Sequence, residues 1–121
     1  MPDFCMRRPC PECPWRRDVE PGKFSPQRFR DLAHTAMEGG LRPLFACHMT
    51  QENRERACAG FLLVTGWDSN AVRYANIQGR YDPASVSADG PLYATYREMA
   101  EANGVDPADP ALDGLPEDRD R

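Results

Sequence analysis

The chain has 121 residues and a formal net charge of −4, and 40% of its residues are hydrophobic, which suits one small domain. No segment approaches the roughly twenty consecutive apolar residues that cross a bilayer, and the N-terminal stretch MPDFCMRRPC lacks the apolar core of a signal peptide. We therefore expect a cytoplasmic protein with no membrane partner. Thiols stay reduced there, so five cysteines favour metal or redox chemistry over structural disulfides.

Residues 1–24 read as an irregular, proline-rich arm that carries the first cysteine pair. Residues 1–30 hold seven basic and four acidic residues, so basic charge is strongest at the front. A helix should follow, because Ser25 is a favourable N-cap and Pro26 suits the first helical position. Gly39-Gly40 would end this helix. Its apolar face would consist of Phe29, Leu32, Ala33, Ala36 and Met37.

The middle of the chain predicts a strand and two short helices. Residues 43–47 (PLFAC) are an apolar run typical of a strand. Residues 57–65 (ACAGFLLVT) fit a helix or a strand. We expect a helix, because Ser69 then caps a second helix over residues 69–77 after a break at Gly66. Residues 79–90 read as irregular.

A last helix and an acidic tail complete the chain. Leu92, Tyr96, Met99 and Ala100 mark the helix, which Asn103-Gly104 ends. Residues 105–121 hold six acids, two arginines and three prolines, and bury too little apolar surface to offset their ordering entropy. We therefore expect a cysteine-rich domain over residues 1–104 and a disordered acidic tail over residues 105–121.

The expected fold class is mostly α with one or two short strands, a small α+β arrangement. It would be a metal-stapled single domain with an irregular N-terminal arm. A chain of about a hundred ordered residues with many prolines builds only a modest core, so a metal cross-link would contribute usefully to its stability.

Four cysteines form the candidate metal site: Cys10, Cys13, Cys47 and Cys58. Two residues separate the first pair, which lets both sulfurs face one point, and four thiolates make a tetrahedral site for zinc. An iron–sulfur cluster is the alternative, since it takes the same ligands. Pro14 stands where zinc knuckles often have glycine, and it has no N–H to donate to a sulfur. The competing interpretation is that these cysteines are small buried apolar residues.

His48 follows Cys47 directly. It could replace Cys47 as a ligand, or orient a ligand through a hydrogen bond. Four cysteine ligands remain the first choice. The fifth cysteine, Cys5, is then spare.

The same residues permit other functions. CPEC over residues 10–13 resembles the CPxC motif of thiol–disulfide enzymes, although those motifs follow a core strand and open a helix. There is no phosphate-binding glycine loop, no HExxH and no constellation of acids, so the sequence favours a non-enzymatic protein. Trp15 beside Arg16 and Arg17 could stack a base and bind phosphates, but a tryptophan beside a metal knuckle more often covers the small core. We expect a protein partner ahead of nucleic acid, because residues 1–104 are neutral overall and the tail is acidic.

The ordered segments CPECPWRRD, FSPQRF, FACHM and ACAGF resemble a small family of uncharacterised proteins from actinobacteria and their phages. That pattern runs CPxCPWR, FxCH and CAG followed by Trp or Phe, and it covers about residues 9–64. The resemblance implies that Cys10, Cys13, Cys47, His48 and Cys58 belong to one unit, and it implies no reaction or substrate. Phe61 stands where the family has tryptophan. A looser similarity links the scattered cysteines to the iron–sulfur regulators of actinobacteria, whose basic C-terminal tail is missing here.

Overall fold

Short helices form the regular part of the chain. The computed structural model describes residues 4–37, 45 and 56–115. Its α-helices are α1 (Pro26–Leu32), α2 (Ala59–Thr65), α3 (Asn70–Ile77) and α4 (Tyr96–Ala102), and its 3₁₀ helices are η1 (Ala33–Ala36), η2 (Gly66–Asp68), η3 (Pro83–Ser85) and η4 (Pro110–Leu112). Within these ranges there is no strand, only two isolated β-bridges. The mostly helical class is therefore confirmed.

The predicted strand over residues 43–47 lies outside the described residues except at Phe45, which belongs to no strand. The metal staple stays a prediction at this point.

Local signals explain where the helices begin and end. Ser69 precedes α3, and its hydroxyl oxygen accepts the backbone N–H of Val72 at 3.3 Å, as the capping prediction requires. Thr95 caps α4 in the same way, accepting from Glu98 at 3.0 Å. The chain leaves α4 through Gly104, whose φ of +98° is a conformation that glycine adopts without strain. Segment 57–65 is helical from Ala59 onward, as expected.

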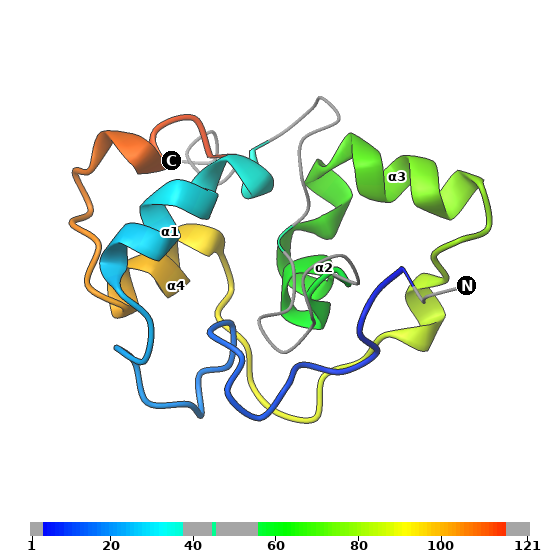
Figure 1. Cartoon of the computed structure of the whole chain (residues 1–121), viewed down its shortest axis with the longest axis horizontal. Helices are drawn as coiled ribbons and strands as arrows, with labels where there is room; N and C mark the ends of the chain where they lie inside the picture. Colours follow the sequence, from blue (N-terminus) through cyan, green and yellow to red (C-terminus); the bar gives the residue numbers. More distant parts are fainter. Residues whose placement is uncertain (1–3, 38–44, 46–55, 116–121) are drawn as a thin grey trace.

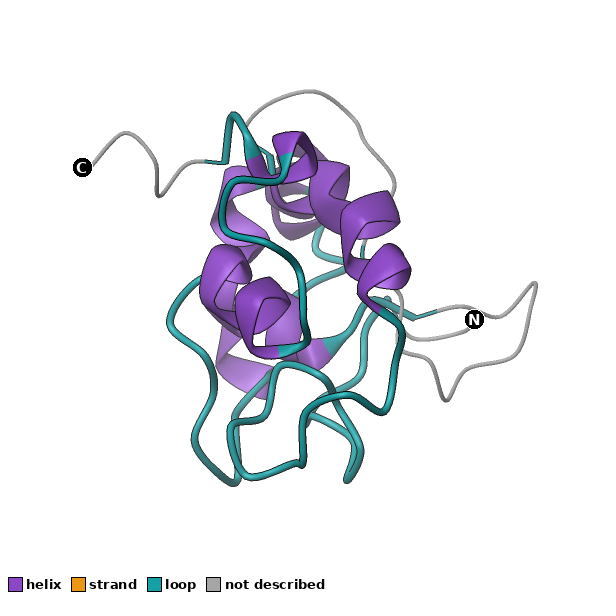
Figure 2. Ribbon diagram, turned by 90° about the vertical axis from the view of Figure 1, so that its left-hand side faces the viewer, coloured by secondary structure: helices purple, strands orange, loops and turns teal. Residues whose placement is uncertain are grey.

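The helices lie in two pairs above an irregular base (Figure 1). On the left, α1 and α4 pack together with η4, and on the right stand α2 and α3. The N-terminal arm and the segment before α4 run along the bottom, and Figure 2 shows the same separation of helices from loops. Backbone hydrogen bonds join these two loops, from Arg17 N–H to the Pro91 carbonyl at 2.9 Å and from Tyr93 N–H to the Trp15 carbonyl at 2.9 Å.

Trp15 occupies the centre of the core. Its side chain is fully buried, and its ring meets the rings of Phe45 and Tyr96 edge-on at centroid distances of 5.6 and 5.5 Å. The hydroxyl of Tyr96 donates to the Phe29 carbonyl in α1 at 2.6 Å. Trp15 therefore joins the arm to both helix pairs. A base cannot stack on a ring with no exposed face, so the idea that Trp15 binds nucleic acid is wrong, and its alternative role in the core is confirmed.

Residues 105–115 pack against the body. Val105, Leu112 and Leu115 are buried, and Asp109 pairs with Arg30 of α1 at 2.7 Å. The guanidinium of Arg97 in α4 donates to the backbone carbonyls of this segment at 3.0 and 2.9 Å. The predicted boundary at residue 104 therefore needs correction, and the packed body extends at least to residue 115. Composition misled because the segment has only three large apolar residues, but all three are buried.

Candidate metal centre

The CPEC segment folds as a tight turn. The backbone N–H of Cys13 donates to the carbonyl of Cys10 at 3.0 Å, which closes a four-residue turn with both cysteines at its ends. A second turn follows at once, since the N–H of Arg16 donates to the Cys13 carbonyl at 3.0 Å. The two turns bring Cys10, Cys13 and Trp15 under the helices, and all three are buried.

Cys58 reaches the same place from the other half of the chain. It is the N-cap residue of α2, and its own N–H donates to the carbonyl of Phe45 at 2.8 Å. The preceding residue, Ala57, forms a parallel bridge with Cys5. The arm therefore pairs with the backbone immediately before Cys58.

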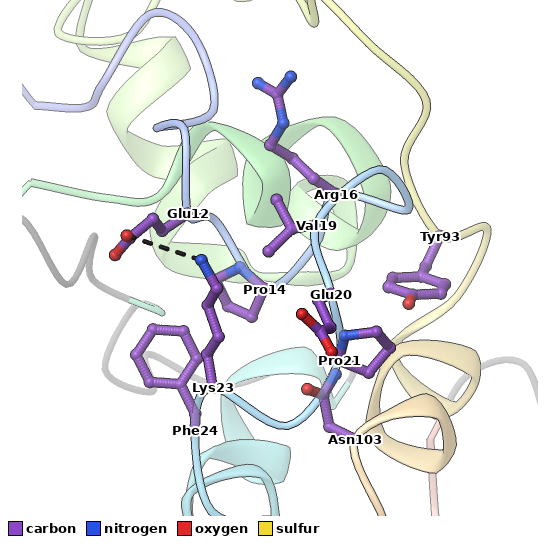
Figure 3. A pocket seen from close by; sticks show the side chains of 10 residues that line it. All are labelled: Glu12, Pro14, Arg16, Val19, Glu20, Pro21, Lys23, Phe24, Tyr93 and Asn103. Carbon is purple, nitrogen blue, oxygen red and sulfur yellow. Dashed lines mark ion pairs between the residues drawn. The ribbon is translucent and has the colours of Figure 1, made fainter.

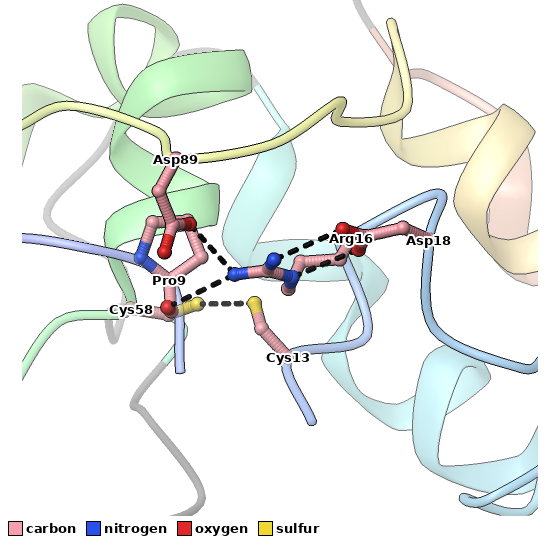
Figure 4. Close-up of polar contacts among 6 residues, drawn as sticks. All are labelled: Pro9, Cys13, Arg16, Asp18, Cys58 and Asp89. Atoms are coloured by element: carbon pink, nitrogen blue, oxygen red, sulfur yellow. Dashed lines mark hydrogen bonds and ion pairs between the residues drawn. The ribbon is translucent and has the colours of Figure 1, made fainter. Parts of the chain in front are cut away.

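The sulfurs of Cys13 and Cys58 lie 3.6 Å apart, although the two residues are 45 positions apart in the chain. Figure 4 shows the side chains pointing at each other. Both are buried, at 0% and 3% exposure. Two of the four cysteines that the sequence singles out are thus in direct contact.

The surroundings shift the pKa values of the two thiols in opposite directions. The hydrogen bond from Cys58 lowers the pKa of Cys13, and the backbone N–H groups of Trp15 and Gly60 and the charge of Arg16 act in the same direction. The hydrogen bond to Cys13 and burial raise the pKa of Cys58. The backbone N–H groups of Phe61 and Gly60 oppose that rise, although the Cys58 side chain closes no cap hydrogen bond. Cys13 is therefore the first of the pair to become a thiolate.

Pro14 does not prevent N–H groups from stabilising the Cys13 sulfur. The residue directly after Cys13 is Pro14, which has no backbone N–H to donate to the sulfur. The donor in the structure is one residue further along, at Trp15, and a second comes from Gly60 in α2.

Gly60 connects the cysteine pair with the core. Its N–H acts on both sulfurs, and its Cα packs against Trp15 so closely that a Cβ there would lie 2.5 Å from the Cβ of Trp15. Phe61, the next residue, stacks on Phe45 at a centroid distance of 6.3 Å. The CPW, Phe45 and CAGF segments therefore meet in space.

Arg16 lies beside the cysteine pair but is already paired (Figure 4). Its guanidinium donates twice to Asp18, at 2.9 and 3.0 Å, and once to Asp89 at 2.7 Å. The Arg16 guanidinium lowers the pKa of Asp18. Arg17 pairs with Glu98 at 2.8 Å. Arg16 thus joins the arm to the loop before α4, and Arg17 joins the arm to α4 itself. The charge of Arg16 acts on Cys13 while it is also paired with the carboxylates of Asp18 and Asp89.

The remaining candidate residues complete no site within the described ranges. No three Cys, His, Asp or Glu side chains there are arranged to hold one metal ion. Cys10, three positions before Cys13, is also buried. Cys47 and His48 lie outside the described residues. Cys5, treated as spare, is buried beside Ala57. Nothing in the spacing of the cysteines indicated that position.

A small pocket lies on the other side of the arm (Figure 3). Pro14, Val19, Pro21 and Phe24 of the arm line it, together with Tyr93 and residues of both charges. Its cavity volume is about 10 Å³, room for about one water molecule and far below the range of about 300–1,000 Å³ that is usual for small-molecule sites. Lys23 and Glu12 at its edge form an ion pair at 3.6 Å. The pocket offers no set of convergent catalytic groups.

The described part of the chain is thus a small helical domain whose irregular arm meets the start of α2 at a pair of buried cysteines, and none of its helices is long and apolar enough to span a membrane. The chain belongs to a family of unknown function (DUF6283), whose model matches residues 5–115. This range includes both cysteines of the pair and the segment after α4. No curated protein and no solved structure matches the chain.

Proposed function

We propose that this protein is a small zinc-binding module in which one zinc ion joins the N-terminal arm to the start of α2. Its ligands are Cys10, Cys13, Cys47 and Cys58. The 3.6 Å distance between the sulfurs of Cys13 and Cys58 carries the proposal. Two thiolates on one tetrahedral zinc, with bonds of about 2.3 Å, lie about 3.8 Å apart.

The surroundings of the two sulfurs suit a metal-bound thiolate pair. Backbone N–H groups of Trp15, Gly60 and Phe61 favour the charged form of one sulfur or the other. These donors are fixed by the turns of the arm and by α2, so they need no rearrangement when the thiols lose their protons. A fully apolar cysteine pair would have no such donors, which argues against the interpretation of these residues as mere core filling.

The length of the connecting chain allows the other two proposed ligands to reach the same point. Cys10 and Cys13 end one hydrogen-bonded turn, so their Cα atoms lie within about 7 Å. Cys47 follows Phe45 by two residues, at most about 7 Å of chain, and the Phe45 carbonyl accepts the N–H of Cys58. We assign His48 the role of orienting the site and not of a fourth ligand.

The zinc ion would act as a cross-link. It would tie an arm whose described residues form no helix or strand before α1 to the helical body. The module would then work through a partner macromolecule, because the described residues contain neither a catalytic constellation nor a pocket of substrate size.

Metal analysis of protein purified without oxygen tests this function. We expect one zinc per chain and no colour, with zinc lost in Cys13→Ser and Cys58→Ser. The matched control Cys5→Ser removes another buried cysteine of the arm and should keep the zinc. Iron with inorganic sulfide would instead support an iron–sulfur sensor or electron carrier.

Substitutions in the FACH segment define the fourth ligand. Cys47→Ala should lose the metal, while His48→Ala should retain it. The reverse result would replace the proposed set with three cysteines and one histidine. A folded protein without any metal would refute the zinc module.

The contact between Cys13 and Cys58 also favours a second function, that of a dithiol. An external disulfide could accept two electrons and two protons from this pair and leave a Cys13–Cys58 disulfide. The sequence pattern pointed to Cys10 and Cys13 for such chemistry, whereas the sulfurs in contact are those of Cys13 and Cys58. A metal-free protein that cycles reversibly between the dithiol and this disulfide would support the dithiol function.

A further inference from the structure

Aromatic rings and arginines form a continuous row of contacts between α3, η2 and the start of the arm, in which Trp67 is exposed and Tyr81 is buried. The guanidinium of Arg80 lies 5.6 Å above the ring of Phe4, which lies 5.7 Å from the ring of Tyr81. Tyr81 in turn lies 5.9 Å from the ring of Trp67. Arg73 donates to the carbonyl of Trp67 at 2.5 Å. We call these five residues the aromatic stripe.

The stripe lies among the most exposed apolar side chains of the described residues. Trp67 is 48% exposed, and Tyr74 and Ile77 on the outer face of α3 are 55% and 80% exposed. The remaining large exposed hydrophobic residue, Leu63, comes from α2. All four exposed large hydrophobic residues of the described part therefore belong to α2, η2 and α3.

The two arginines of the stripe, Arg73 and Arg80, have no carboxylate partner among the described residues. The same holds for Arg7 and Arg8, which are exposed at the start of the arm. By contrast, each of Arg16, Arg17, Lys23 and Arg30 pairs with an aspartate or glutamate. Helix α3 contains no acidic residue, and Figure 1 places the start of the arm beside η3 and close to α3. Positive charge is therefore available at both ends of the stripe.

Most of the acids lie elsewhere in the chain, although Asp68 and Asp82 directly follow Trp67 and Tyr81 of the stripe. Residues 82–121 hold ten acidic and three basic residues, whereas residues 56–81 hold three arginines and one aspartate. The net charge of −4 thus combines a charge of −7 over residues 82–121 with +2 over residues 56–81, the segment that contains α2 and α3. A polyanion is attracted to the arginines of this segment more than to any part of residues 82–121.

We propose that the aromatic stripe binds single-stranded nucleic acid. Bases would stack on the exposed ring of Trp67 and on that of Tyr74, which lies in α3 outside the stripe as defined. The arginines of the stripe would contact the phosphates that link those bases. A protein partner would have to supply carboxylates at both ends of an apolar strip, whereas a phosphate backbone supplies charge at regular spacing. No residue of the stripe is a proposed metal ligand, although Phe4 directly precedes the buried Cys5, so the proposal does not rest on the metal.

Tryptophan fluorescence provides a direct test. The chain has two tryptophans, and Trp15 is fully buried, so quenching by a ligand reports on Trp67. A thymidine oligonucleotide of about 20 nucleotides at about 20 mM salt should quench the emission saturably. Four phosphate contacts give a slope of log K against log salt of about −3.

Variants of the stripe separate stacking from charge. Trp67→Ala should weaken binding of the fluorescein-labelled oligonucleotide about 5- to 150-fold, the range for loss of one stacked base. The double variant Arg73→Gln and Arg80→Gln should halve the salt slope, because two of four contacts are gone. It changes only exposed side chains, so it stays informative if Trp67→Ala fails to fold. The matched control, Arg17→Gln with Lys23→Gln, removes two exposed cations elsewhere and should leave binding unchanged.

Several results would overturn the proposal. They are an absence of quenching at low salt, equal binding of a polyglutamate peptide, and unchanged binding in the Arg73 and Arg80 double variant. Self-association that disappears in Trp67→Ala, seen by sedimentation without oligonucleotide binding, would assign this face to a protein contact instead.

Discussion

Replacing Gly60 by alanine tests whether α2 and Trp15 are as tightly joined as the structure indicates. A Cβ at this position would lie 2.5 Å from the Cβ of Trp15 and 2.8 Å from its Cγ. Carbon atoms in proteins pack at about 3.5–4.0 Å. The nearest atom is a Cβ, which every residue except glycine carries, so a smaller side chain at position 15 would not remove the conflict. The backbone of the arm or of α2 would have to move.

Two effects of opposite sign set the size of the change. Alanine is a better helix former than glycine by up to about 1 kcal/mol. Overpacking a core that cannot relax costs about 1–3 kcal/mol and occasionally more, and Trp15 is held on its far side by the rings of Phe45 and Tyr96. A shift of about 1 Å at fully buried atoms belongs at the upper end of that range. We therefore expect Gly60→Ala to lower the free energy of unfolding by about 2 kcal/mol.

Gly66 provides the matched control at the end of the same helix. A Cβ there would meet its nearest neighbours at 3.5–3.7 Å, which is ordinary contact, and the φ of Gly66 is −54°. Gly66→Ala should therefore be neutral or stabilising by up to about 1 kcal/mol. Urea unfolding of both variants, followed by far-UV circular dichroism, measures the difference. Equal stability of the two, or a larger loss for Gly66→Ala, would refute the close packing of α2 on Trp15.

Three further predictions concern the C-terminal segment. Truncation after Gly104 removes three buried apolar side chains and should cost several kcal/mol at about 1.5–3 kcal/mol each, whereas truncation after Leu115 should leave the thermal midpoint nearly unchanged; two equal midpoints would restore the boundary at residue 104. Backbone hydrogen bonding to Ala111 and the charge of Arg30 hold the pKa of Asp109 below its ordinary value, so its contribution to stability is present above pH 4 to 5 and is lost as the pH falls through the lowered pKa. Asp109→Asn should accordingly lower the thermal midpoint at pH 7 and make less difference near pH 2, and a constant difference would contradict this linkage. Arg30→Gln should show the same pH dependence to a smaller extent, because the N–H of Ala111 remains.

The sequence predicted those parts of the fold that local chemistry determines. The apolar periodicity after Ser25, the cap at Ser69 and the glycine after α4 each act within one or two turns of chain. Their signals are therefore complete in the sequence itself. The choice of helix for residues 57–65 succeeded for the same reason, since it rested on the cap that follows.

The parts that the sequence did not predict depend on contacts between distant segments. Nothing near Trp15 shows that α2 will cover one side of it and Tyr96 another. The sequence likewise cannot show that Gly60, from α2, supplies the N–H that Pro14 lacks. The sequence correctly favoured a core position for Trp15, with base stacking as the alternative because arginines follow it. It gave no sign that Trp67 is the exposed tryptophan, whose partner Arg73 comes from the next helix. Residues 105–115 were read by average composition, which does not register that three of them fit into the body.

The position of Gly60 links the proposed metal centre to the stability of the whole domain. Its N–H acts on the sulfurs of Cys13 and Cys58, while its Cα rests against Trp15. A shift of the sulfurs on binding or losing a metal would therefore be transmitted directly to the ring that joins the two helix pairs. The arm has no helix or strand of its own before α1 within the described residues, so its place in the core depends on these contacts. For that reason we interpret the cysteine pair and the aromatic core as one cooperative unit, distinct from the exposed face of α3.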